Sequence, residues 1–308
     1  VFVTACIAQV AQCFAINWEE PTCGAIFWGH VGNCCAIGER QIVQTSAVEF
    51  DEFADYAFFA QHFDNFQNQI GTGCAFDHFA CQLKADDFGD QHRNWLAEHN
   101  YVVLTFDYRG IGKSLAGAHV RSVKTTKQDW GELDMPAALD WLAATYPNVP
   151  LHLIGHSAGG QLIGLMPNFH KLTSVVQFAA SSGYIANLRR PTRWIARFLL
   201  AGYIPLTAHC LGYVPAKLIG WGEDLPAMVA TQWARWCLSP GYISNDFGRE
   251  IKRHYYNDFD IPIRAIYACD DPIATQANID DLLRLFPKAL IRKMRLDPTQ
   301  FGLQSIGH

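Results

Sequence analysis

Several features that mark other protein classes are missing from the sequence. Only 17 % of the 308 residues are charged and the net charge is −5, so the chain lacks the basic surface typical of nucleic-acid binding. Its 10 cysteines include no C-x-x-C pair and no Cys/His spacing typical of zinc sites. No uninterrupted apolar run reaches the roughly 18 residues of a membrane-spanning helix. We therefore expect no nucleic-acid partner, no metal, no membrane span and mostly buried free thiols.

Basic residues are scarce in the first 92 positions. This segment holds two basic residues against 12 acidic ones, a net charge of −10, whereas the remainder has a net charge of +5. It also holds 7 of the 10 cysteines and 12 of the 20 phenylalanines, but only one of the 14 prolines. Such a break predicts a boundary near residue 92, with an altered or misread amino-terminal segment as the second interpretation. We therefore treat residues 1–92 as an atypical N-terminal segment.

A targeting segment is not expected at the amino end. Val3–Cys6 loosely matches a lipoprotein cleavage box, but no basic residue precedes the apolar stretch that contains it. The expected location is cytoplasmic.

The rest of the chain alternates between strand and helix. Half of the residues are hydrophobic, which is enough for a large buried core. Short β-branched and aromatic runs predict strands, and apolar residues at helical spacing predict the helices between them. Strands are expected at 101–106, 151–154, 172–180, 262–268 and 289–296, and helices from about 129 and at 158–166 and 276–285. This order predicts an α/β protein with a mainly parallel sheet and crossover helices.

Two local predictions are more specific. The first helix is expected to begin near Asp129, with Glu132 completing a capping box, and to bury one face formed by Leu133, Ala137 and Trp141. Within residues 1–92 the pattern is less regular: 25–28 is a candidate strand that ends in Gly29-His30, and 50–66 is a candidate helix.

The motif with the clearest chemistry is Gly155-His156-Ser157-Ala158-Gly159-Gly160. It lies between a predicted strand and a predicted helix, as a nucleophile elbow requires. Glycines two residues before and after Ser157 avoid side-chain clashes in so tight a turn. The helix that follows would direct the Ala158 N–H at the site, where it can stabilise an oxyanion. A phosphate-binding turn is disfavoured because the sequence has neither a G-x-G-x-x-G nor a Walker pattern here.

A serine nucleophile needs a histidine base and an acid that orients the base. In the fold that carries this motif, the chain order is serine, acid, histidine. His308 alone lies beyond the next credible acid, which is expected after the 262–268 strand, at Asp270 or Asp271. Asp271 is preferred because it precedes Pro272, with Asp270 as the alternative. Non-catalytic interpretations of these residues are a solvated, helix-capping acid pair and a structural histidine.

Four segments carry a family resemblance, and they lie at 106–114, 153–160, 222–226 with 233–237, and 306–308. On these motifs, residues 93–308 resemble the α/β-hydrolase superfamily, in particular its bacterial branch of serine hydrolases. The resemblance implies a triad of Ser157, Asp271 and His308, a helical cap over the site, and no metal or organic cofactor. It further implies that a loop after an upstream strand gives a second oxyanion donor, for which 27–30 and 70–74 are the candidates.

The stretch from 182 to 255 interrupts the strand–helix rhythm and contains no obvious strand. It is rich in tryptophan, and four arginines lie at its start: Arg189, Arg190, Arg193 and Arg197. The functional interpretation is a lid with an apolar acyl pocket and a basic cluster toward anionic substrates. The alternative is that the aromatics form the lid's own core and the arginines a solvated face.

Together these features predict core regions at 93–181 and 256–308 and a cap at 182–255. The favoured function is hydrolysis of a carboxylic ester or thioester of a small-molecule acyl substrate, through an acyl-enzyme. Amide cleavage and acyl transfer would use the same groups. The alternative of another class is a catalytically inactive or truncated member with a binding function or none, since the chain stops on the residue that would be the base. The sequence does not indicate an oligomeric state.

Overall fold

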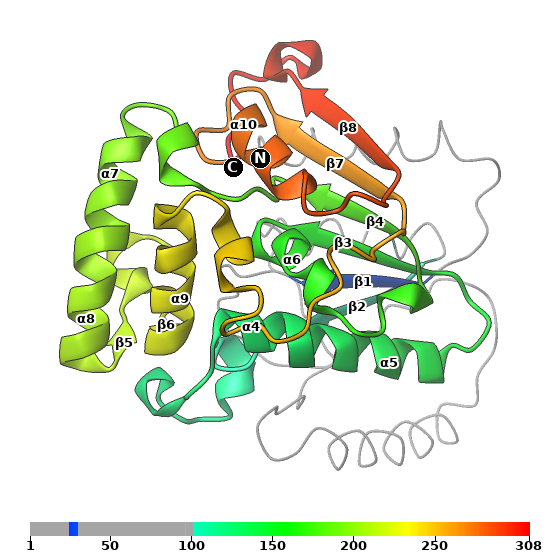
Figure 1. Cartoon of the computed structure of the whole chain (residues 1–308), viewed down its shortest axis with the longest axis horizontal. Helices are drawn as coiled ribbons and strands as arrows, with labels where there is room; N and C mark the ends of the chain where they lie inside the picture. Colours follow the sequence, from blue (N-terminus) through cyan, green and yellow to red (C-terminus); the bar gives the residue numbers. More distant parts are fainter. Residues whose placement is uncertain (1–24, 30–95, 97–100) are drawn as a thin grey trace.

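The computed structural model describes residues 25–29, 96 and 101–308 (Figure 1). Its described part is built around a six-stranded sheet with the order β2-β1-β3-β4-β7-β8, and every neighbouring pair in it is parallel. The strands are β1 (Ala25–Gly29), β2 (Val102–Phe106), β3 (Leu151–His156), β4 (Leu172–Phe178), β7 (Ile263–Ala268) and β8 (Ile291–Leu296). The predicted α/β class with a parallel sheet is confirmed.

Helices lie on the faces of this sheet and in the segment between β4 and β7. The α-helices are α4 (Lys127–Asp129), α5 (Met135–Thr145), α6 (Ala158–Gln161), α7 (Thr192–Phe198), α8 (Ile204–Leu211), α9 (Ala227–Leu238) and α10 (Gln276–Leu283). Two π-helical turns occur, η3 (Trp130–Asp134) and η7 (Leu199–Tyr203). The 3-10 turns span 112–115, 120–122, 163–165, 169–171, 185–187, 216–219, 242–246 and 298–301. The helix expected over 158–166 is thus a short α-helix followed by a 3-10 turn.

The first long helix differs from its prediction in register. Its capping box is formed by Thr126 and Asp129, one turn earlier than expected, and the chain then passes through the π turn before α5. A π turn adds a residue to the helical repeat, so positions counted at α-helical spacing across it leave the buried face. Leu133 is therefore exposed instead of buried, whereas Met135 and Leu139 are fully buried.

Alternate residues of the central strands feed two apolar clusters. Leu151 and Leu153 of β3 belong to the larger cluster, and Ile154 belongs to a smaller one with Val176 and Ile266. Because successive side chains of a strand point to opposite faces, both faces of the sheet are covered. This arrangement is typical of a buried parallel sheet.

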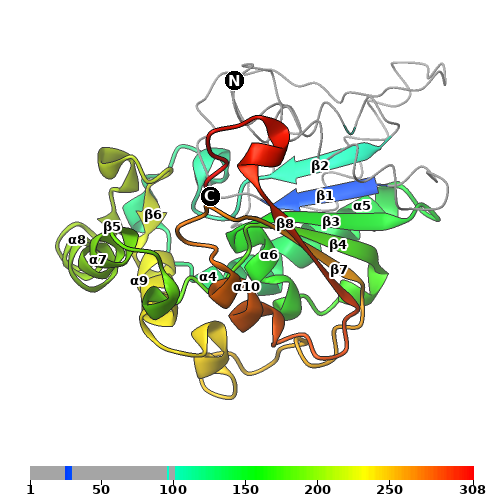
Figure 2. The ribbon, with the colours of Figure 1, turned by 90° about the horizontal axis from the view of Figure 1, so that it is seen from above.

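The segment between β4 and β7 contains α7, α8 and α9, together with the two-residue antiparallel strands β5 (Tyr213–Val214) and β6 (Leu225–Pro226). These helices lie beside the sheet, at the far side of the molecule in two views (Figures 1 and 2). The short strand pair corrects the expectation of no strand here. The residue boundaries of core and cap remain predictions.

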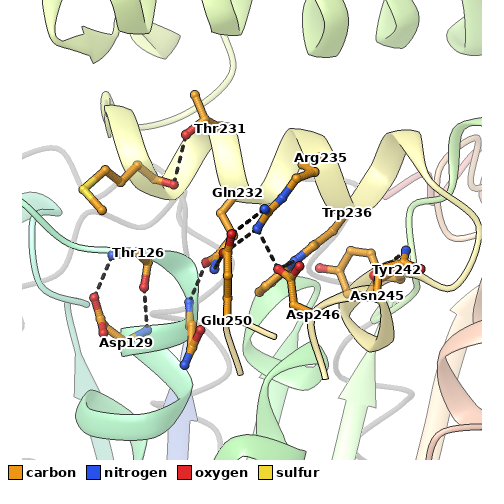
Figure 3. Close-up of polar contacts among 12 residues, drawn as sticks. Thr126, Asp129, Thr231, Gln232, Arg235, Trp236, Tyr242, Asn245, Asp246 and Glu250 are labelled. Carbon is orange, nitrogen blue, oxygen red and sulfur yellow. Dashed lines mark hydrogen bonds and ion pairs between the residues drawn. The ribbon is translucent and has the colours of Figure 1, made fainter. Parts of the chain in front are cut away.

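A partly buried polar cluster fixes α9 to the 246–250 loop (Figure 3). Asp246 Oδ2 accepts from the indole N–H of Trp236 at 2.6 Å and from Arg235 at 2.7 Å. Arg235 also donates to both carboxylate oxygens of Glu250 at 2.6 Å. On the same helix, Gln232 Oε1 accepts from the backbone N–H of Gln128 at 2.9 Å. Through this last contact α9 is tied to the N-terminus of α4.

One helical stretch bears on the expectation of no membrane span. By length and composition, the 20 residues Thr192–Leu211 could cross a membrane, although they lack an uninterrupted apolar run. Several other predictions lie outside the described residues, namely the helix at 50–66, the loop candidate at 70–74, the Val3–Cys6 box and the boundary at residue 92.

Candidate active site

Ser157 occupies a strained turn between β3 and α6. Its φ of 46° and ψ of −109° lie in a region that residues with a Cβ seldom adopt. A Cβ on Gly155 would lie 2.5 Å from the carbonyl carbon of Gly159, and one on Gly160 would lie 2.6 Å from the Cβ of Ala180. The predicted role of Gly155 thus has a direct steric cause, and Gly160 is a second constrained glycine that the motif alone did not single out.

The parallel sheet brings the ends of separate strands to this turn. The backbone N–H of Ser157 donates to Phe178 O, at the end of β4, over 2.8 Å. The next strand, β7, ends at Ala268, and only Cys269 separates it from Asp270 and Asp271. Because the carboxyl ends of parallel strands share one edge, residues far apart in sequence meet there.

Ser157, His308 and Asp271 form a continuous hydrogen-bonded chain. His308 Nε2 lies 3.2 Å from Ser157 Oγ, and His308 Nδ1 lies 2.8 Å from Asp271 Oδ2. Asp271 is fully buried, and its Oδ1 accepts from the backbone N–H groups of Ile273 and Ala274, both at 2.7 Å. Both carboxylate oxygens are thus occupied, and the orientation of the carboxylate toward the imidazole is fixed.

Asp270, the alternative acid, contacts the backbone beside His308 instead of its ring. Its Oδ2 accepts from the N–H groups of Ile306 and Gly307, at 2.9 and 3.2 Å. Its Oδ1 is buried and has no hydrogen-bond partner among the described residues. Gly307 has a φ of 75°, which glycine adopts without strain. The two adjacent carboxylates thus have separate tasks: one meets the imidazole, the other holds the segment that carries it.

Backbone N–H groups at the same edge are placed for an oxyanion. Ala158 is the first residue of α6, and first-turn N–H groups have no carbonyl one turn earlier to bind. On the other side, β1 pairs with β3 and places Gly29 opposite Gly155. The chain therefore leaves β1 beside the nucleophile turn, where the second donor is expected. Of the two candidate loops, 27–30 begins at this place, and its last residue lies outside the described part.

A buried lysine behind α6 was not found by sequence reasoning. Lys127 Nζ donates to Gln161 Oε1 at 2.7 Å and to the hydroxyl of Tyr242 at 3.1 Å, and lies 5.5 Å from the Trp233 ring centroid. Burial without a carboxylate partner lowers the pKa of Lys127 to about 7. Its partners lie 34 and 115 residues away in sequence, so no local pattern could indicate the contact.

Gln161, in the last turn of α6, uses all its polar side-chain atoms in this network. Its Oε1 also accepts from Tyr242 OH at 2.6 Å, and its Nε2 donates to Ser181 O at 2.7 Å. The backbone carbonyl of Gln161 accepts from Tyr256 OH at 2.7 Å. The helix that follows the nucleophile, α6, is thus fixed by hydrogen bonds to Ser181, Tyr242 and Tyr256.

Two arginines of the predicted basic cluster contact backbone carbonyls. Arg189 donates to the carbonyl of Cys269, next to the acid pair, and Arg193 donates to the carbonyl of Ala186. Within the described residues, no group of three or more His, Cys, Asp or Glu side chains could hold a metal ion.

Residues 88–212 match the family model described as serine aminopeptidase, S33. No curated protein sequence matches the chain. Among solved structures, the monoacylglycerol lipase of Paleococcus ferrophilus is 13 % identical, with a TM-score of 0.42, over 68 % of this chain and 82 % of that one. The RedJ thioesterase of Streptomyces coelicolor is 15 % identical, with a TM-score of 0.39, over 95 % of this chain and 87 % of that one.

A hydrolase from Oleispira antarctica is 16 % identical, with a TM-score of 0.36, over 66 % of this chain and 76 % of that one. The segment that matches the family model contains β3, the strained serine and α6, and β3 lies within the parallel sheet. The fold is thus that of the α/β hydrolases, and residues 88–212 are similar to the serine aminopeptidase, S33 family.

Proposed function

We propose that this chain is a serine hydrolase that cleaves a carboxylic ester or thioester through an acyl-enzyme. The observation that carries the proposal is the hydrogen-bonded chain from Ser157 Oγ through the His308 ring to Asp271 Oδ2. A strained serine, an imidazole within hydrogen-bond distance and a buried carboxylate behind it are the parts that nucleophilic acyl transfer needs.

In the first half-reaction, Ser157 Oγ attacks the carbonyl carbon of the substrate while His308 Nε2 takes the hydroxyl proton. The oxyanion that forms accepts a hydrogen bond from the Ala158 N–H and, as the family resemblance implies, from a second backbone donor. Asp271 keeps the Nδ1 proton of the imidazole in place and stabilises the imidazolium. Collapse of the intermediate breaks the bond to the leaving group, which leaves with the proton from Nε2 and gives an acyl-serine.

In the second half-reaction, a water molecule replaces the leaving group. His308 Nε2 removes a proton from the water as its oxygen attacks the acyl carbon, and the same oxyanion donors stabilise the second tetrahedral intermediate. The proton then returns to Ser157 Oγ as the acyl bond breaks, which releases a carboxylic acid and restores the enzyme. The His308 side chain is 23 % exposed, so water can reach it.

A fluorophosphonate probe and a panel of acyl substrates test the proposal. The wild-type chain should be labelled at Ser157 and should release acid from esters or thioesters, and Ser157→Ala should lose both properties. Absence of labelling in a folded sample would contradict the proposal and favour a catalytically inactive member of the superfamily.

Amide hydrolysis is the second candidate, because the matching family model is described as a serine aminopeptidase. The same serine, imidazole and oxyanion donors would serve it, with His308 protonating a leaving amine. Parallel assays with ester, thioester and aminoacyl-amide substrates distinguish the two, since only an aminopeptidase should have its highest kcat/KM on the amide with a free amino group.

A further inference from the structure

The outermost helical stretch of the cap exposes a row of large apolar side chains. Along α7, η7 and α8, Trp194, Phe198 and Leu206 are 63, 70 and 64 % exposed. Trp194 and Phe198 are four residues apart in α7, so their side chains lie on one side of that helix, and Leu206 is an exposed apolar residue of α8, beyond the π turn. We call this surface, with the exposed Ile195, the outer cap face. Contiguous apolar patches of this kind mark interaction sites on soluble proteins.

The opposite side of the same stretch is part of the protein core. Leu199, Leu200 and Ile204 are buried in it, and α8 packs against α9. In both ribbon views α7 and α8 lie at the end of the molecule away from the sheet (Figures 1 and 2). A helix held along one side in this way cannot span a bilayer without losing that packing. It can lie in the plane of an interface, with its exposed face inserted.

The charge around the outer cap face is of one sign. Between Asp140 and Glu223 the sequence contains no acidic residue, whereas Arg189 and Arg190 precede α7, Arg193 lies in its first turn and Arg197 in its last turn. Arg190 and Arg197 are exposed, in a chain whose net charge is −5. An apolar face bordered by guanidinium groups complements the phosphates and acyl chains of an anionic membrane. A second copy of the chain would bring like charges together at this face.

We propose that the outer cap face docks on bilayers that contain anionic phospholipid, with α7 and α8 lying in the interface. The apolar side chains enter the acyl boundary while Arg190 and Arg197 contact lipid phosphates. This inference concerns binding and does not depend on the proposed hydrolysis. The N-terminal end of α7 is joined to the acid loop through the Arg189 N–H, which donates to Pro272 O at 3.2 Å.

Vesicle co-sedimentation of the full chain tests the proposal. We expect binding to phosphatidylcholine vesicles that contain about one-third phosphatidylglycerol, much weaker binding to phosphatidylcholine alone, and release by salt. Phe198→Glu should lower the partition coefficient roughly tenfold or more, since it places a charge in the apolar boundary. The matched control is Leu290→Glu, at a 62 % exposed position in the loop before β8, which should bind like the wild type.

The basic residues are tested separately by the double variant Arg190→Glu/Arg197→Glu. It should lose the preference for anionic vesicles, whereas Arg292→Glu/Arg295→Glu, which changes two exposed arginines of β8, should keep it. Equal loss in the Leu290 or β8 controls, or binding that does not depend on phosphatidylglycerol, would overturn the proposal. So would a wild-type dimer that fails to bind vesicles and becomes monomeric on Phe198→Glu, since the face would then be covered by a second copy.

Discussion

Replacement of Asp271 by asparagine exchanges one carboxylate oxygen for an amide nitrogen. The hydrogen bonds of the site determine which of the two oxygen positions the nitrogen takes. Asp271 Oδ1 accepts from two backbone N–H groups at 2.7 Å, so an asparagine must place its carbonyl oxygen there. The amide nitrogen then takes the Oδ2 position, 2.8 Å from His308 Nδ1, and donates to it. The imidazole is forced into the tautomer with its proton on Nε2, which faces Ser157 and can no longer accept the hydroxyl proton.

The expected loss follows from the removal of the base. For a triad in which the acid is replaced by its amide, the wrong tautomer costs about four orders of magnitude in kcat. That factor corresponds to about 5 kcal/mol of transition-state stabilisation. Fold and KM should change little, because the asparagine has the size of the aspartate and its oxygen keeps the two N–H donors.

Asp270→Asn is the matched control at the neighbouring position. Asp270 Oδ2 accepts from Ile306 and Gly307, while its Oδ1 has no partner among the described residues, so the amide fits with its nitrogen on the unpartnered side. We expect kcat to fall by less than about tenfold, because the His308 segment keeps its anchor and the charge alone is lost.

The assay is kcat and KM on an activated ester for both variants, with the rate of fluorophosphonate labelling as a second readout. The reasoning is refuted if Asp271→Asn retains wild-type kcat, or if Asp270→Asn falls as far as Asp271→Asn. Either result would mean that the observed hydrogen bonds do not set the tautomer of His308.

Three further predictions concern the framework around the site. Because burial holds the pKa of Lys127 at about 7, against an ordinary value of 10.5, the folded state resists protonation, so stability is lost as pH falls through this window and gained as it rises. Raising the pH from about 7.5 to about 9 should add about 2 kcal/mol to the wild-type free energy of unfolding relative to Lys127→Met, as measured by urea unfolding; parallel pH profiles would contradict the argument. Gly155→Ala places a Cβ 2.5 Å from the backbone of Gly159 and should lower stability by more than about 2 kcal/mol and abolish labelling; wild-type thermal unfolding and labelling rates would be incompatible with the observed turn. Asp246→Ala leaves the buried indole N–H of Trp236 without an acceptor and should cost about 2 kcal/mol in the same unfolding assay, whereas truncation of the exposed Glu250 should cost less than about 1 kcal/mol. Equal costs for these two carboxylates would contradict the burial argument.

The features that the sequence predicts well are those with a local physical cause. The parallel strands follow from short β-branched runs, and the turn at Ser157 follows from glycines that a tight bend requires beside it. The strand at 25–29, in an otherwise irregular region, was also identified from its apolar run. The π turn at Trp130–Asp134 is not predicted, because nothing in its residues separates it from an α-helical turn. Leu133 within it is exposed, whereas Trp141 of the predicted face is buried.

Non-local contacts account for the rest. The choice between Asp270 and Asp271 depends on which carboxylate points toward His308, and that direction is set by the backbone N–H groups that each one accepts from. Lys127 is unremarkable in sequence, and its partners come from α6 and from the 242–246 turn. Such contacts form only when distant segments are brought together, so patterns read along the chain do not contain them.

The network around Gln161 has a consequence for how a substrate enters. Tyr242 belongs to the segment that follows α9, so this part of the cap is bonded directly to the helix behind the nucleophile. Lifting it as a hinged lid would strip Lys127 of a hydroxyl partner and displace α6 in the same motion. The 242–246 turn is therefore expected to stay fixed to α6, so any movement that admits a substrate should involve segments without such contacts.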